Sequence, residues 1–413
     1  MFGRIFPGQV CTARTIAAHG SGGVPLFQDF AMETRRKSSA GPRLLLWFLC
    51  LLLVALVPVW AQTNARLQAE SLEQQGQDAE AEQLWRGILQ AHPGNAEALA
   101  HIGLLEAHQG HYDEAVTYYR KALALRPAFP GVRLNLGLAL FKASRFREAA
   151  ESFKPLLQQR PGDQRLTILL AMSYYGMHSY AKSIPYLKEA TQAAPQNLEL
   201  RLALAHSCLW AKQFPCVLDV YKQILSLNAE SAEADMLAGE AMDAMHNTAG
   251  AIAQFRAAAR ANPDEPNVHF GLGYLLWTQR QYPEAASEFQ AELDRNPQQG
   301  HARAYLGDAL LRQNEYAKAE PELKQAIVAD PSFALPYLDL GIINAASGRN
   351  EEAVKEFRKA IQLEPNDVDS HWRLARVYRS MGKTAEAKAE FAKVVVMKRQ
   401  QDQNPAPKVL DIP

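Results

Sequence analysis

Three histidines are the side chains whose spacing is best suited to holding a metal ion. His101 and His108 are seven residues apart, which puts them on one face of a helix, and His111 follows closely. Neutral imidazole is a common ligand of zinc and other transition metals. The alternative is that all three are solvated surface histidines. We favour this second interpretation and predict no metal site and no cofactor.

The four cysteines show no pattern that would bind a metal or attach a haem. No C-x-x-C or C-x-x-C-H occurs among Cys11, Cys50, Cys208 and Cys216. Cys208 and Cys216 are eight residues apart and could form a disulfide across a helix pair in an oxidising compartment. Alternatively, Cys208 is a small core residue with a free thiol.

Motifs of the common enzyme classes are absent from the chain. There is no P-loop, no G-x-S-x-G, no H-E-x-x-H and no dinucleotide fingerprint after a strand. Lys and Arg total 44 and Asp and Glu total 44, so the formal net charge is zero. A protein that binds nucleic acid through bulk electrostatics would carry a basic excess. The sequence therefore predicts neither an enzyme nor a nucleic-acid-binding protein.

A 34-residue repeat organises most of the chain. "GHYDEAVTYYRKALALRPAF" begins at Gly110 and "GRNEEAVKEFRKAIQLEPND" begins at Gly348, 238 residues later, which is 7 × 34. Steps of 34 from Gln62 give ten copies up to residue 401 without an insertion or a deletion. Below, a position within a repeat is counted from the first residue of that copy.

Each conserved-looking column of the repeat has a physical interpretation. Apolar residues at positions 4, 7, 8 and 11 and at 17, 20, 24 and 27 form one face on each of two helices. Position 8 is Gly or Ala in all ten copies, and position 24 is always large and apolar. We expect the small residue at 8 to face the small residue at 20, as Gly307 would face Ala319, with position 24 filling the space beside them. Gly or Asn at position 15 and Pro at position 32 then end the two helices.

These columns and the 34-residue period resemble the tetratricopeptide repeat. The resemblance covers residues 62–401 and implies an all-α helix–turn–helix solenoid, a right-handed superhelix with no sheet. It also implies that the first helix of each repeat lines a concave groove, with positions 2, 5, 6, 9, 12 and 13 pointing into it. Proteins of this family bind other proteins or peptides in that groove.

The predicted groove carries aromatic and basic residues. Because the core positions are already filled, these side chains are surplus to stacking and indicate a binding surface; the alternative is that an aromatic stripe on a helix is core. We expect Glu240, Asp243, Asp308 and Asp339 to add an acidic patch. The candidate partner-binding residues are Phe141, Tyr175, Trp210, Phe270, Tyr274, Trp277, Tyr305, Trp372, Arg373 and Arg376.

The N-terminal part has the features of an export signal. Residues 44–60, "LLLWFLCLLLVALVPVW", are uncharged and follow a basic flank. Such a run is a signal peptide, here with a possible cleavage after Ala61, or a membrane anchor through residues 44–60, and either interpretation exports the repeats. We interpret residues 1–43 as an unstructured extension and basic flank, with Met32 as a possible translation start. Residues 402–413 resemble a disordered tail.

The sequence thus predicts an exported or membrane-anchored scaffold that binds protein or peptide partners through its groove. It would lie outside the cytoplasmic membrane, in the periplasm or the extracellular space, or anchored with the repeats outside. The alternative function is a non-catalytic subunit of a cell-envelope enzyme or of a secretion or assembly complex.

Overall fold

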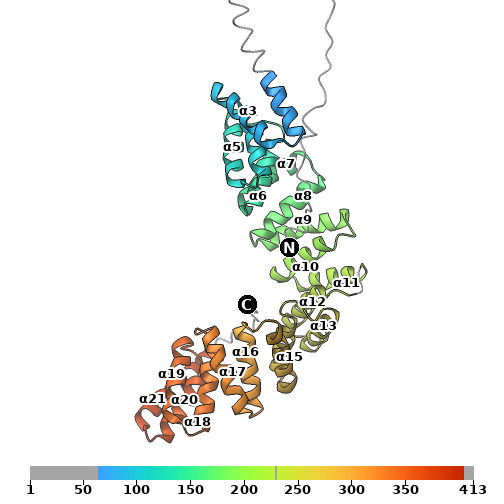
Figure 1. The fold of residues 1–413 in the computed structure, drawn as a ribbon. Helices are drawn as coiled ribbons and strands as arrows, with labels where there is room; N and C mark the ends of the chain where they lie inside the picture. The colour runs from blue at the N-terminus through green and yellow to red at the C-terminus, as the bar shows by residue number, and fades with distance from the viewer. Residues whose placement is uncertain (1–63, 228–229, 404–413) are drawn as a thin grey trace, which may run out of the picture. The chain divides into compact units, whose positions relative to one another are not determined.

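Helices account for all the regular secondary structure in residues 64–227 and 230–403, the part that the computed structural model describes. The predicted all-α fold is confirmed there (Figure 1). The predictions for residues 1–61 and for most of the tail lie outside the described residues. None of the described helices is both long and apolar enough to cross a bilayer.

Residues 64–74 form the first described helix, and the chain then follows the two-helix period. The chain divides into two compact units, residues 1–200 and 201–413. The labelled helices are α3 (Asp78–Ala91), α4 (Ala96–His108), α5 (Tyr112–Leu125), α6 (Val132–Lys142), α7 (Phe146–Gln159), α8 (Gln164–Gly176), α9 (Tyr180–Ala193), α10 (Leu198–Trp210), α11 (Phe214–Leu225), α12 (Ala232–Ala244), α13 (Thr248–Ala261), α14 (Val268–Thr278), α15 (Tyr282–Arg295), α16 (Gly300–Arg312), α17 (Tyr316–Ala329), α18 (Leu335–Ala346), α19 (Asn350–Leu363), α20 (Val368–Ser380) and α21 (Thr384–Gln403).

The turn between the two helices of a repeat has the same backbone in every copy. Position 15 has a positive φ in all ten repeats, between 55° and 84°. Five of these residues are the Gly and Asn residues that the sequence indicated, which tolerate the left-handed conformation. The others are Ser144, His178, Lys212, His246 and Arg280, which adopt it at a steric cost because the repeat imposes it.

Polar side chains at position 34 begin several of the first helices. Asn95 accepts hydrogen bonds from two backbone N–H groups of α4, and Asp367 does the same for α20. Asp163 and Ser231 cap α8 and α12 with one bond each. Each side chain satisfies backbone donors that would otherwise have no partner. Position 34 follows Pro at position 32, so the end of one repeat sets the start of the next.

Position 24 fills the core of each helix pair. Its residues are almost all completely buried, including Phe153, Phe289 and Leu323 at 0% exposure. A Cβ added to Gly307 would lie 2.6 Å from Cγ of Leu323, so the predicted contact of Gly307 with Ala319 was wrong. Position 8 faces position 24 because antiparallel helices pair residues that are equally far from the turn between them.

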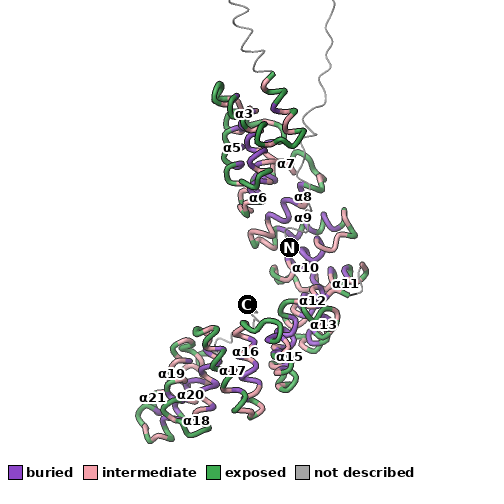
Figure 2. Tube along the Cα trace, in the orientation of Figure 1, coloured by how far each residue is buried: buried purple, intermediate pink, exposed green. Residues whose placement is uncertain are grey.

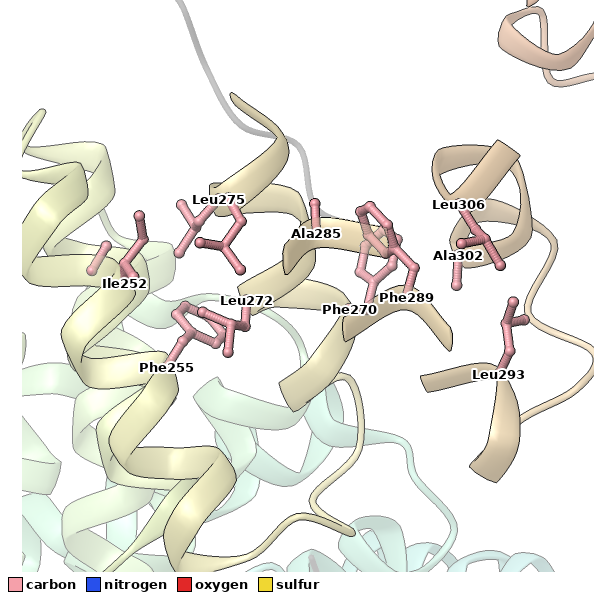
Figure 3. Packing of buried hydrophobic residues seen from close by; sticks show 12 residues of the cluster. Ile252, Phe255, Phe270, Leu272, Leu275, Ala285, Phe289, Leu293, Ala302 and Leu306 are labelled. Atoms are coloured by element: carbon pink, nitrogen blue, oxygen red, sulfur yellow. The ribbon is translucent and has the colours of Figure 1, made fainter. Parts of the chain in front are cut away.

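Each unit buries the same stripe on successive helices (Figure 2). In the second unit, Phe255 of α13 packs beside Leu272 of α14, and Phe289 of α15 lies against Phe270 (Figure 3). First helices of neighbouring repeats also contact each other, as α14 contacts α16 and α16 contacts α18. Side chains of successive first helices therefore meet on one surface, which we call the first-helix face.

Candidate functional site

The predicted groove residues differ widely in their exposure. Trp210 is 59% exposed and Trp372 is 37% exposed, whereas Phe141 and Phe270 are buried at 7% and 4%. The expectation that Phe141 and Phe270 are surface residues was wrong, because both rings pack into the helix pairs. Arg376 is exposed, and the remaining candidates are partly buried: Tyr175, Tyr274, Trp277, Tyr305 and Arg373.

Three of the partly buried residues form one cluster in the second unit, which we call the aromatic triad. The rings of Tyr274 and Trp277 on α14 are stacked with centroids 5.9 Å apart. Tyr305 on α16 contacts Tyr274 at 5.3 Å and Trp277 at 5.2 Å, edge to face in both cases. These spacings are typical of favourable aromatic pairs. The triad packs with its inner side on the buried cluster that contains Phe270 and Phe289, so it is part core and part surface.

The triad is tied to a buried carboxylate. Trp277 Nε1 donates to Asp308 Oδ2 at 2.5 Å, and Arg312 Nε donates to Asp308 Oδ1 at 3.1 Å. Asp308 is 0% exposed, and so is Asp339 on α18. The predicted acidic surface patch was therefore wrong for these two residues. The prediction that Trp277 is surplus to packing was also wrong, since its indole N–H satisfies a buried anion.

Burial governs the ionisation of the groups around the triad. Desolvation and the neighbouring carboxyl of Asp308 raise the pKa of Asp339 well above the usual aspartate value. Burial also raises the pKa of Tyr305, with Tyr274 and Asp308 acting in the same direction. Glu240, which is partly exposed, has its pKa raised by burial as well. This face therefore carries less negative charge near neutral pH than its sequence suggests.

A second cluster lies near the C-terminus. The guanidinium of Arg376 lies 4.7 Å from the centroid of the Trp372 ring, within the range of a cation–π interaction. Arg373 donates to Asp369 at 2.7 Å on the same helix, α20. Trp372 and Arg376 thus present an aromatic ring and a cation at the surface of the second unit.

The three histidines of the metal hypothesis contact three different carboxylates. His101 Nδ1 lies 2.9 Å from Glu73. His108 faces Asp78 at 3.5 Å, and His111 faces Glu106 at 3.0 Å. The structure does not join them in one ligand set, and each contact is an ordinary surface pairing.

Among the described residues, one group has metal-ligating atoms close together: Glu70, Glu97 and His101, within 4.8 Å of one another. The sequence gave no sign of it, because Glu70 lies 27 residues before Glu97. The guanidinium of Arg66 pairs with Glu70 at 2.9 Å and with Glu97 at 3.1 Å. A cation of the chain itself therefore already neutralises this group.

The two open interpretations of Cys208 and Cys216 are resolved in favour of the disulfide. Their Cα atoms are 5.8 Å apart and their sulfurs are bonded. The bond joins α10 to α11 near the turn of the fifth repeat. Cys208 is at the same time completely buried, so the core interpretation was correct about its location.

Models of the tetratricopeptide repeat match along most of the array. The matched residues are 66–131, 106–173, 238–299, 270–334, 343–382 and 368–401. Together with the recurring two-helix unit, these matches decide the family. This chain belongs to the tetratricopeptide repeat family. Repeats of this family suggest a scaffold for protein–protein interaction, and the fold is typically non-catalytic.

Several solved tetratricopeptide repeat structures are similar to the chain. MamA 41-end from Desulfovibrio magneticus RS-1 is 23% identical, with a TM-score of 0.38, over 41% of this chain and 97% of that one. YrrB, described as having an unusual peptide-binding site, is 18% identical, with a TM-score of 0.37, over 43% and 92%. A monomeric IFIT1 mutant with Gppp-AAAA is 16% identical, with a TM-score of 0.38, over 81% and 90%. No curated protein matches the chain.

Proposed function

We propose that this tetratricopeptide repeat protein is an exported scaffold that binds a partner polypeptide on its first-helix face. The aromatic triad of the second unit is the observation that carries the proposal. It places three large rings, from α14 and α16, at the edge of a core whose central positions are filled by other residues. Tyrosine and tryptophan supply large contact areas at a small loss of side-chain entropy, and they are enriched among residues that dominate binding energy.

The second cluster supplies a further contact of the same type. Trp372 is more than one third exposed and is paired with Arg376. Tryptophan and arginine are the other residue types that most often dominate interface energies. A partner that covered this pair would desolvate the cation–π contact and strengthen it. We therefore assign Trp372 and Arg376 to the same binding face as the triad.

Two features support export. The apolar run at residues 44–60 follows a basic flank, which is the pattern of a signal or an anchor. The Cys208–Cys216 disulfide fits the same compartment, because disulfides persist in oxidising environments outside the cytoplasm. A fusion of alkaline phosphatase after residue 403 tests this part, since that enzyme is active only when exported. An inactive fusion of normal abundance would contradict export.

Site-specific photo-crosslinking in cells tests the binding face. Benzoylphenylalanine would replace Trp210 or Trp372 on first helices, and Val328 on the second helix α17 serves as the matched control, being 83% exposed. We expect the two first-helix positions to yield the same crosslinked partner and the control to yield none. Crosslinks at Val328 alone would contradict the proposed face.

Binding by purified variants then separates function from folding. Trp372→Ala should weaken capture of that partner about tenfold or more, since truncating a dominant interface residue costs about 2 kcal/mol. Its melting temperature should stay close to that of the wild type, because the side chain is exposed. Phe289→Ala is the contrasting core variant and should lose about 3–5 kcal/mol of stability. Unchanged capture by Trp372→Ala would remove this residue from the site.

A further inference from the structure

Asp339 on α18 is a buried acid without a donor. It is 0% exposed, and neither of its carboxyl oxygens accepts a hydrogen bond in the described structure. An ionised carboxylate in such a place would lose its hydration and gain nothing in return. Native structures rarely keep a buried polar group unsatisfied, so the missing partner needs a chemical explanation.

Asp308 on α16 supplies that explanation. Its carboxyl lies against Asp339 and is equally buried. Unlike Asp339, it is well supplied with donors, because Trp277 donates to one oxygen and Arg312 to the other. Two adjacent buried carboxyls do not both ionise readily, since the second charge would repel the first. The donors select Asp308 as the anion and leave Asp339 as the neutral acid.

Other elements around the pair do not change this assignment. Arg312 of α16 and Arg373 of α20 are the cations acting on Asp339. Both have carboxylate partners of their own, Asp308 and Asp369. The titratable groups Tyr305 of α16 and Tyr282 of α15 act on Asp308 and Arg312, respectively. Helices α17 and α19 pack near the pair with apolar side chains, including Leu323 and Phe357.

We propose that Asp339 is a protonated carboxyl that donates its hydrogen to Asp308, and that this acid pair positions Trp277 on the first-helix face. The pair is a positioning device: it contacts no partner and acts through the indole. The value of that position for binding rests on the proposed function. The shared proton itself does not, because it can be measured without a partner.

The pair makes the folded state depend on pH in an unusual direction. The unfolded chain releases the Asp339 proton near the usual aspartate pKa of about 3.9, whereas the folded chain retains it to higher pH. Stability from this group is therefore greatest below the unfolded pKa, falls as pH rises between the two values, and is constant above the folded value. Within that window the unfolding equilibrium constant rises about tenfold per pH unit from this proton alone.

Fluorine NMR of the full chain labelled with 5-fluorotryptophan tests the proposal. The signal that is absent from Trp277→Phe identifies Trp277. We expect this signal to titrate between pH 4.5 and 9.5 in the wild type and in Asp264→Asn, a matched control at an aspartate that is 80% exposed. In Asp339→Asn the signal should stay at the wild-type low-pH position throughout, because the amide is neutral and donates to Asp308 as the acid does.

Circular dichroism at each pH shows that every variant remains helical, and each remaining outcome has a fixed meaning. A Trp277 signal that does not titrate in the wild type overturns the shared proton. A signal that titrates identically in Asp339→Asn assigns the titration to another group and also overturns it. If Asp339→Asn is displaced or unfolded at all pH values, the residue is needed as an anion and the proposal fails. Failure of the crosslinking experiment above would leave all three readouts unaffected.

Discussion

Replacing Gly137 with alanine measures how closely position 8 is packed. Gly137 lies on α6, and an added Cβ would lie 2.8 Å from Cδ1 and 2.9 Å from Cζ of the Phe153 ring. Carbon atoms in favourable contact are about 3.5–4.0 Å apart. The ring must therefore move by close to an ångström, and it is completely buried. Overpacking of this kind costs about 1–3 kcal/mol.

The same substitution also removes a glycine from a helix, which stabilises by about 1 kcal/mol. Gly87 on α3 isolates that second effect, because it is exposed and has no atom within 4 Å of an added Cβ. We expect Gly87→Ala to be stabilising, and Gly137→Ala to be about 1–3 kcal/mol less stable than Gly87→Ala. Urea unfolding followed by circular dichroism gives the difference, and hydrogen exchange in α6 and α7 localises it. If both variants are stabilised equally, Phe153 does not lie against position 8 and the helix-pair register is wrong.

Three further substitutions test separate parts of the structure. Arg280→Gly should stabilise by about 0.5–1 kcal/mol in urea unfolding, since φ is 59° there and glycine adopts this region freely; a loss of stability would contradict the left-handed turn. Trp277→Phe removes a donor from a buried carboxylate and should cost about 1.5–3 kcal/mol, whereas Trp372→Phe should stay within about 0.5 kcal/mol; equal melting temperatures would contradict the Trp277 bond. Replacing Cys208 and Cys216 with alanine should cost about 2–3 kcal/mol for so short a loop, and thiol labelling of the unreduced wild type should fail.

The period and the helix stops could be predicted from sequence because they depend on local chemistry. Glycine at position 15 predicts a left-handed residue whatever its surroundings, and Gly110 and Gly348 adopt it. The same conformation at Lys212 or Arg280 has no local signal. It follows only from the repeat, in which the contacts of two packed helices outweigh about 1–2 kcal/mol of backbone strain. The regular step of 34 would have predicted all ten positions had it been applied to the backbone as well as to the side chains.

Pairing across the helix hairpin was predicted less well because two small residues suggested a simple match. Gly307 and Ala319 are both small, yet the residue opposite Gly307 is Leu323. The turn at Asn314 contains the information that was needed, since residues equally distant from it must face each other. Size complementarity then places the large side chain against the glycine. A small residue at position 20 serves the backbone approach instead, as in the 3.3 Å between an added Cβ at Gly103 and the carbonyl oxygen of Ala115.

The binding face was the least predictable part because the fate of a polar side chain depends on partners far along the chain. Trp277 and Asp308 are 31 residues apart and meet only when successive first helices stack. From sequence, each looks like a surface residue at a groove position. Once stacked, the indole satisfies the carboxylate, the second carboxyl of Asp339 takes up a proton, and both leave the surface. An array built only from its apolar columns would stack without this network. Its presence in the second unit ties the position of an aromatic side chain on the first-helix face to a buried ionisation, which the repeat pattern alone does not require.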